Sequence, residues 1–172
     1  MLKLRYYLVW LSRITHCRGF GIQSPADYWL VRYVINEHWP YYQYDALGRY
    51  DDWLTRKLGC LYFRLANWRQ PRVITADGYR SYLQAGCRKA SFGEAAELVL
   101  LRLDSEWRGR LDVLFQRVDE HSVLMVEGIW KNKKAWADIV NDERTGICFN
   151  LYYCGIVLFD RKRTKQHYII NF

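Results

Sequence analysis

The sequence predicts an α/β fold in a single domain, residues 1–172, with a helical N-terminal cap over residues 1–70 and a sheet-containing core over residues 71–172. Up to residue 70, apolar residues recur at spacings of three and four, which is typical of amphipathic helices. From Arg72 onward, short aliphatic runs alternate with helical patterns, and this alternation indicates a parallel sheet covered by helices. No repeat or linker-like tract divides the chain, so one domain is expected.

Three main helices are predicted in the cap. The first carries a stripe typical of a half-buried helix, formed by Leu4, Leu8, Leu11 and Ile14. Ser24 before Pro25 fits the start of the second, whose apolar face is expected to comprise Trp29, Leu30, Tyr33 and Val34. The third is predicted over Asp52–Arg69, where leucines recur every three or four residues.

Three parallel strands are predicted in the core, over residues 72–77, 97–103 and 122–127. Helices are expected over residues 105–120 and 133–141, and the tail contains strand-like runs at residues 146–151, 156–160 and 167–171. Turns are predicted at residues 91–94, before the second strand, and at residues 152–155 in the tail. A parallel connection needs at least about 10–12 residues, so the segment between Asp77 and Leu98 has room for only one. We therefore expect a sheet of about five strands, with the Val73 strand at or near one edge.

Charge is distributed unevenly along the chain. Residues 1–90 hold 14 Lys and Arg against 6 Asp and Glu, whereas residues 91–172 hold 12 of each class, which together give the net charge of +8. The basic half is also rich in aromatic residues, and this combination leaves nucleic-acid binding open as one function. No apolar run is long enough to cross a membrane, and the five scattered cysteines fit reduced thiols, so a cytoplasmic protein without a membrane partner is expected.

Several segments, in order, resemble class I S-adenosylmethionine-dependent methyltransferases, and in particular a bacterial O-methyltransferase-like group with a helical N-terminal extension. The resemblance is carried by residues 19–25, residues 61–74 and residues 122–159 with the Ala135-Trp136 pair. It implies a Rossmann-like sheet, here shortened to about five strands, and S-adenosylmethionine as the cofactor of an active member.

In that family the first strand ends in an acidic residue followed by a glycine-rich turn, where the backbone approaches the cofactor. The matching turn here spans residues 76–82. Gly78 keeps the first glycine, Ala76 stands where the acid is expected, and Asp77 is displaced by one position. The strand that would supply a carboxylate for the ribose hydroxyls has no counterpart.

Two further strand ends complete the expected site. Arg102 stands at the end of the fourth family strand where an acid is usual, and the nearest carboxylate is Asp104. Glu127 ends the strand matching the fifth, and a single carboxylate there makes a poor cation site, so no metal is expected. The resemblance thus implies Asp77, Gly78, Asp104 and Glu127 as remaining cofactor-site residues, and it identifies no catalytic residue.

The sequence therefore favours a methyltransferase-like protein with eroded cofactor motifs, which is non-catalytic or reassigned to binding and needs no cofactor. One alternative is an active S-adenosylmethionine-dependent methyltransferase that acts on a small acceptor. A further alternative is a basic nucleic-acid-binding module. The shortened sheet also leaves an edge strand, which is to be covered either by the segment of residues 79–92 or by a protein partner or a second copy of the chain.

Overall fold

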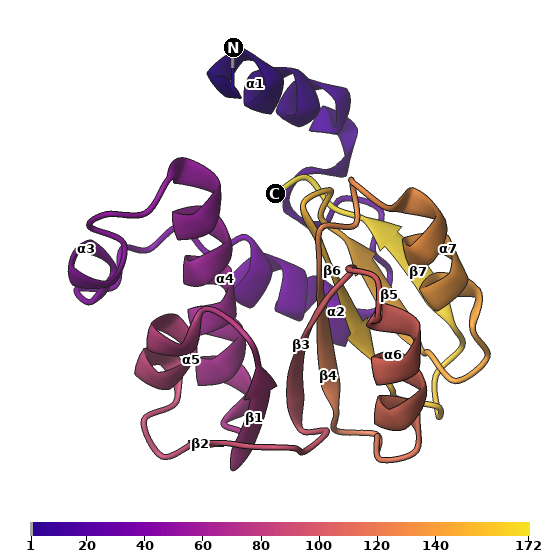
Figure 1. The fold of residues 1–172 in the computed structure, drawn as a ribbon. Coiled ribbons are helices and arrows are strands. Elements are labelled where there is room, and N and C mark those ends of the chain that lie inside the picture. Colours follow the sequence, from indigo (N-terminus) through magenta and orange to yellow (C-terminus); the bar gives the residue numbers. More distant parts are fainter. Residues whose placement is uncertain (1) are drawn as a thin grey trace.

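The computed structural model of the protein describes residues 2–172, and it shows an α/β fold in which helices cover a seven-stranded mixed sheet (Figure 1). The strands are β1 (Val73–Ala76), β2 (Ser91–Phe92), β3 (Leu98–Arg102), β4 (Val123–Glu127), β5 (Ile147–Asn150), β6 (Cys154–Leu158) and β7 (Gln166–Ile169). Their order across the sheet is β2-β1-β3-β4-β6-β5-β7. β6 runs antiparallel to both neighbours, and all other pairs are parallel.

The prediction of about five strands is wrong, because the sheet has seven. All three strand-like runs of the tail join it, and Ser91 and Phe92, which the sequence places in a turn, pair with β1 as a two-residue strand. The placement of the Val73 strand near one edge is confirmed, since only β2 lies outside it. β1, β3 and β4 also lie side by side and parallel, as predicted.

One face of the sheet is covered by α2 (Pro25–Leu30), the π-helical segment η2 (Val31–Ile35), α4 (Trp53–Arg69) and α5 (Arg80–Gly86). Asp52 begins α4 as predicted, and its carboxylate accepts hydrogen bonds from the backbone N–H groups of Leu54 and Thr55. The helices α4 and α5 approach closely at Gly86, where a Cβ atom would lie 2.2 Å from the carbonyl oxygen of Phe63. Short helical segments η1 (Ile14–Gly19) and α3 (Tyr44–Leu47) lie in the connections.

The burial predicted for the first two helices is wrong in part. The helix α1 (Leu2–Ser12) projects from the body of the molecule (Figure 1), and the stripe that was expected to be half-buried is exposed at Leu4, Leu8, Leu11 and Ile14. In α2 and η2, Leu30 and Val34 are buried, but Trp29 and Tyr33 are about half exposed. Spacing identifies residues that share a helix face, but it does not determine which face meets the core when both faces are apolar.

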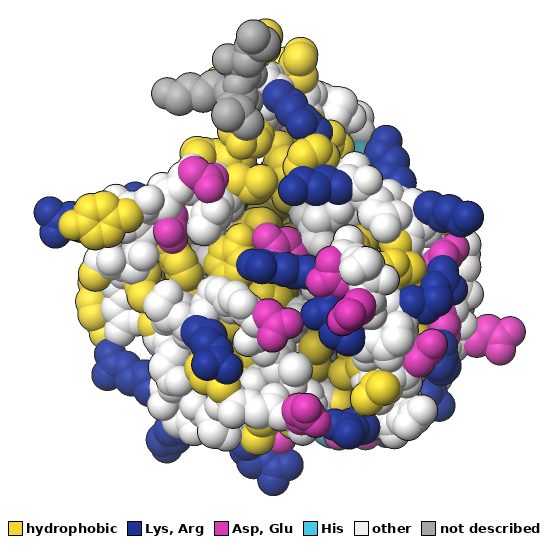
Figure 2. Space-filling model, viewed as in Figure 1, with side chains coloured by type: hydrophobic (Ala, Val, Ile, Leu, Met, Phe, Trp, Pro, Cys, Tyr) yellow, Lys and Arg dark blue, Asp and Glu magenta, His cyan; other side chains and the backbone are white. Residues whose placement is uncertain are grey.

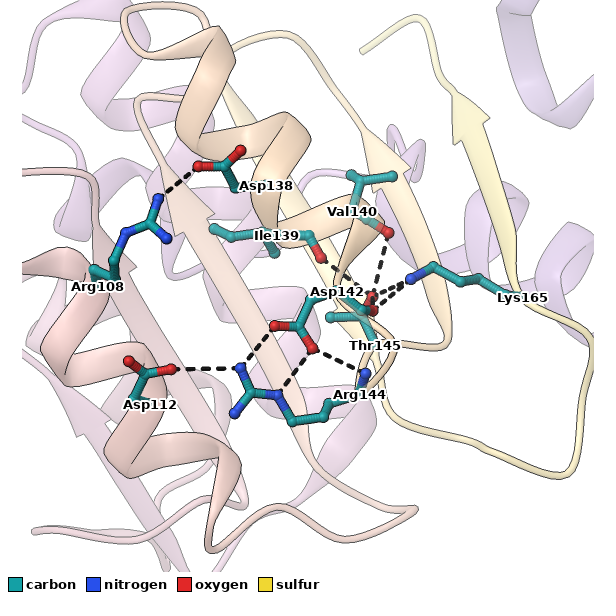
Figure 3. A network of polar contacts seen from close by, with 9 residues as sticks. All are labelled: Arg108, Asp112, Asp138, Ile139, Val140, Asp142, Arg144, Thr145 and Lys165. Atoms are coloured by element: carbon teal, nitrogen blue, oxygen red, sulfur yellow. Dashed lines mark hydrogen bonds and ion pairs between the residues drawn. The ribbon is translucent and has the colours of Figure 1, made fainter.

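The other face is covered by α6 (Trp107–Phe115), which is shorter than predicted, and α7 (Lys133–Asn141), which matches its predicted bounds. Figure 3 shows the ion pairs around them: Arg108 of α6 pairs with Asp138 of α7, and Arg144, in the loop after α7, pairs with Asp112 of α6 and with Asp142. The hydrogen bond from Arg144 lowers the pKa of Asp142 below its ordinary value. Lys165 joins this network from the segment before β7, donating to Thr145 and to the carbonyl oxygen of Asp142.

Candidate binding site at the C-terminal edge of the sheet

The four residues expected from the sequence to form a site lie at one edge of the sheet, where β1, β3 and β4 end. Asp77 and Gly78 directly follow β1, Asp104 follows β3 by one residue, and Glu127 is the last residue of β4. Because these strands are adjacent and parallel, their C-terminal ends meet at the same edge. Ligands of open α/β sheets bind at this edge, so the side chains there determine what the sheet can hold.

Asp77 and Asp104 are joined by Arg110 from α6. The guanidinium Nη1 atom lies 3.2 Å from Asp77 Oδ2, and Nη2 pairs with Asp104 and donates to the carbonyl oxygen of Arg102 at 3.1 Å. The hydrogen bond from Arg110 lowers the pKa of Asp104 below its ordinary value. Both carboxylates therefore already have a cationic partner from the protein itself.

Glu127 is held in the same way by residues from two other segments. Arg102 Nε lies 3.0 Å from Glu127 Oε2, and the Tyr79 hydroxyl donates to Oε1 at 3.2 Å. The hydrogen bond to Glu127 raises the pKa of Arg102, while burial and the nearby carboxylate raise the pKa of Tyr79. Glu127 thus accepts from two protein donors, and Tyr79 remains protonated at neutral pH.

The space beside Gly78 is filled by a side chain of the protein. A Cβ atom at Gly78 would lie only 2.7 Å from Arg102 Nη2, so the end of the Arg102 side chain lies directly against the glycine. The next residue, Tyr79, adopts a left-handed conformation with φ of 55°, and α5 begins directly after it. The Arg102 side chain therefore lies where the resemblance places a ligand against the backbone of this turn.

A cavity of about 540 Å³ lies beside these ion pairs, between β1, β3 and α6. Its floor includes Val99 and Leu101, and Asp77 and Arg110 belong to its wall. The cavity lies on the face of β1 that α5 does not cover. On that face, α6 packs on β3 and β4. No further helix follows β2 to cover this corner of the sheet.

A second cavity, which we call the aromatic cavity, lies between α1, the start of α4 and the residue that precedes β6. Its volume is about 570 Å³, and it is lined by Tyr6, Tyr7, Val9, Trp10, Trp53, Lys57, Tyr153 and Phe172. Figure 2 shows hydrophobic side chains gathered in a hollow beneath α1, next to a group of acidic and basic side chains. The N–H of Gly128, directly after β4, donates to the carbonyl oxygen of Tyr153 at 3.0 Å. The aromatic cavity therefore adjoins the same edge of the sheet as Glu127.

The rings of the aromatic cavity pack against one another in a defined arrangement. Tyr6 stacks on Trp53 with ring centroids 4.1 Å apart, and Tyr153 meets both rings edge to face. The Lys57 ammonium lies 5.0 Å from the Trp53 ring centroid and 4.4 Å from that of Phe172. Burial, and then the positive charge of Arg64, lower the pKa of Lys57 to about 8.

Sequence reasoning did not identify the residues of the aromatic cavity. Trp53 and Lys57 belong to α4, where the leucine spacing predicted a helix but gave no indication of a binding site. Tyr153 lies in a segment that the sequence predicts to be a turn. The aromatic richness of the first half was a signal, but it indicated core packing or a nucleic-acid surface. Only the path of α1 back over the sheet edge brings Tyr6 to Trp53 and Tyr153.

Within residues 2–172, no helix combines the length and apolar character needed to cross a bilayer. In the same part of the chain, no three His, Cys, Asp or Glu side chains converge in a way that could hold a metal ion. No protein-family model, curated protein or solved structure matches the sequence or the fold.

Proposed function

We propose that this protein is a non-catalytic relative of the class I methyltransferases that acts by binding and does not use S-adenosylmethionine. The proposal combines the sequence resemblance with the arrangement of the sheet edge. It places function in contacts made by the protein surface and its cavities, and assigns no group-transfer chemistry to the chain.

The strand order supports a Rossmann-like origin. In a doubly wound sheet of order 3-2-1-4-5, loss of the outermost strand leaves 2-1-4-5. The order β2-β1-β3-β4 is that arrangement, with β2 reduced to two residues and the helix that would follow it missing. On this interpretation the second strand, which supplies the ribose carboxylate in the family, is kept as only two residues with Glu94 shortly after it on the cavity wall, and the outermost strand is lost.

The single observation that carries the loss of cofactor binding is the position of Arg102. Its guanidinium lies against Gly78 and pairs with Glu127, where the family resemblance expects the cofactor to contact the glycine turn. A ligand entering there would have to displace Arg102 and leave Glu127 with only the Tyr79 hydroxyl as a partner. Breaking a partly buried ion pair of this kind opposes binding.

Calorimetric titration with S-adenosylmethionine and with S-adenosylhomocysteine tests the proposal. We expect no saturable binding of either compound up to about 1 mM, because few placed polar groups remain free to recognise it. Saturable binding in the micromolar range would contradict the proposal and favour the alternative of an active methyltransferase on a small acceptor.

Two tryptophan variants would locate any binding that is observed. Gly78→Trp places a large side chain against Arg102, whereas Lys89→Trp places the same side chain at an exposed position before β2, outside the cavity between β1, β3 and α6. Binding that is lost only in Gly78→Trp would show that the family's cofactor site is retained. Binding that survives in both variants would occur elsewhere and would leave the loss of that site intact.

A further inference from the structure

We infer that the aromatic cavity binds a flat, largely apolar small molecule that carries a carboxylate, with the anion paired to Lys57. This inference rests on the proposed binding role, and it identifies the site and the class of ligand. It depends on the unpaired ammonium of Lys57, on the aromatic walls of the cavity and on its size.

Lys57 is the first of two polar groups without a partner. Within residues 2–172, its ammonium forms no hydrogen bond and no ion pair, and it lies over the faces of Trp53 and Phe172. Aromatic faces attract a cation, but they do not accept its hydrogen bonds as an anion does. A partly buried ammonium in this setting is stabilised by a ligand that supplies a negative charge.

The hydroxyl of Tyr153 is the second polar group without a partner. The side chain of Tyr153 is only 3% exposed and lines the aromatic cavity, and its buried hydroxyl has no hydrogen-bond partner among the described residues. Burial raises its pKa to about 12, so the hydroxyl keeps its proton. Because this hydroxyl is closed off from the cavity, Tyr153 contributes its ring to the wall, and the Lys57 ammonium is the group that a ligand carboxylate would pair with.

The remainder of the cavity determines the shape of the ligand. Tyr6, Trp53 and Phe172 present ring surfaces, which favour a planar apolar body by stacking and edge contacts. The volume of about 570 Å³ lies within the range of about 300–1,000 Å³ that is typical of small-molecule sites. The site is thus sized for one small molecule.

The charges around Lys57 favour an anion and disfavour a cation. Arg64, on the same helix, is the cation whose charge lowers the pKa of Lys57, and its guanidinium donates to the carbonyl oxygens of Val34 and Ile35. On the side of the aromatic cavity, the other titratable groups are Cys154, Tyr6 and Tyr153. Lys57 also lines a neighbouring cavity with Glu37, His38, Tyr44 and Cys60, and the Glu37 carboxylate there accepts from the Tyr41 hydroxyl. Burial lowers the pKa of His38, and burial with the nearby Glu127 raises the pKa of Cys154, so both are uncharged at neutral pH.

The test compares two probes of nearly the same shape, 2-naphthoate and its neutral amide, 2-naphthamide, by calorimetric titration at pH 7. We expect the wild-type protein to bind one equivalent of 2-naphthoate with a dissociation constant of about 100 µM. The amide should bind at least about tenfold more weakly, since it cannot form charge-assisted hydrogen bonds with the cavity. Equal affinity for the two probes, or no binding of 2-naphthoate, would overturn the inference.

Variants assign the effect to the cavity. Lys57→Met keeps the apolar stem but removes the charge, and it should weaken 2-naphthoate about tenfold while leaving 2-naphthamide unchanged. Trp53→Ala should weaken both probes, and Lys89→Met, at an exposed lysine before β2, should change neither. If Lys57→Met bound 2-naphthoate as tightly as the wild-type protein does, the assignment of the anion to Lys57 would be overturned. The two-probe comparison on the wild type stands whether or not a variant folds.

The pH profile supplies an independent readout. The pKa of Lys57 is about 8, so the free protein loses this cation as the pH rises from 7 to 9, and binding of 2-naphthoate should weaken over that interval. Affinity for 2-naphthamide should stay constant. These outcomes are separate from those of the S-adenosylmethionine titration, because each ligand is measured alone and the variants affect different sites.

Discussion

Arg110, Arg144 and Arg163 each pair with two carboxylates, and each connects segments that lie far apart in the sequence. The planar guanidinium suits such bridging, because its donors point in fixed directions. The presence of arginine at position 102 was visible in the sequence, as was the carboxylate of Glu127. Their pairing was not, because it depends on the register that sets Arg102 opposite Glu127 in β3 and β4.

The pair between Asp27 and Arg163 has the most buried carboxylate of these bridges. Asp27 is 1% exposed, and its Oδ1 atom lies 2.7 Å from Arg163 Nη1. We expect Asp27→Asn to lower the free energy of unfolding by about 2 kcal/mol, since a buried charged hydrogen bond is lost. Urea denaturation followed by circular dichroism measures the change.

A double-mutant cycle measures the interaction energy between Asp27 and Arg163 apart from their contacts with other residues. Arg163→Met removes the cation, and the double variant Asp27→Asn/Arg163→Met should be more stable than the sum of the single effects predicts, with a coupling of about 1 kcal/mol. Strict additivity of the two single variants would show that the contact does not contribute to stability.

Among the elements, α1 departs most from what its pattern indicates. Its spacing of leucines is that of an ordinary amphipathic helix, yet Tyr6 and Val9 face the core and the leucines face outward. Both faces are apolar, so periodicity alone could not choose between them. The stacking of Tyr6 on Trp53, at a centroid distance of 4.1 Å, fixes the orientation through a contact 47 residues away in the sequence.

Two neighbouring substitutions test this orientation. Leu8 is 58% exposed, so Leu8→Ser should change the free energy of unfolding by less than about 0.5 kcal/mol. Val9 packs against the core, and Val9→Ser should lower it by about 1 kcal/mol or more. Chemical denaturation of both variants gives the comparison, and the reverse ranking would mean that the leucine stripe is the buried face.

The strands were easier to predict than the helices of the cap. Residues 98–101 and 123–126 are apolar runs that are buried on both faces, and such runs have few alternative structures. Residues 73–76 alternate between partly buried and buried positions. The two-residue β2 was missed because its pairing depends on Arg72 and Ile74, whose carbonyl oxygens accept from Ser91 and Gly93. The aromatic cavity was missed for the same reason, since its walls come from four separate parts of the chain.

At the scale of the whole molecule, the chain carries a net charge of +8, and several of its cations are paired with carboxylates of the protein. Arg102, Arg110 and Arg163, for example, are directed to carboxylates of the protein and are not free to meet an external anion. A nucleic-acid surface requires a set of cations that track a phosphate backbone. These three arginines lie outside residues 1–90, where the basic excess is concentrated, so their pairing removes free cations from the second half of the chain only.

We expect only weak and non-specific association with nucleic acid. Fluorescence anisotropy with labelled single-stranded and double-stranded oligonucleotides should show binding at low salt that falls steeply as salt is added, because each neutralised phosphate releases counterions. Heparin, a polyanion without bases, should compete equally well. A sequence-selective complex that persists at about 0.15 M salt would instead favour the nucleic-acid-binding alternative.

The outer edge of the sheet has a consequence for how this chain can change in length. β2 contributes only two residues and is the last strand at that edge, so chain inserted between residues 86 and 91 would not have to pass between existing strands. The entropy of closing a loop rises slowly, by about 0.6 kcal/mol for each doubling of its length. An added strand and helix could pair outside β2 and cover the open corner between β1 and α6. A strand and helix could therefore be gained or lost at this edge of the sheet while β1, β3 and β4 keep their present pairing.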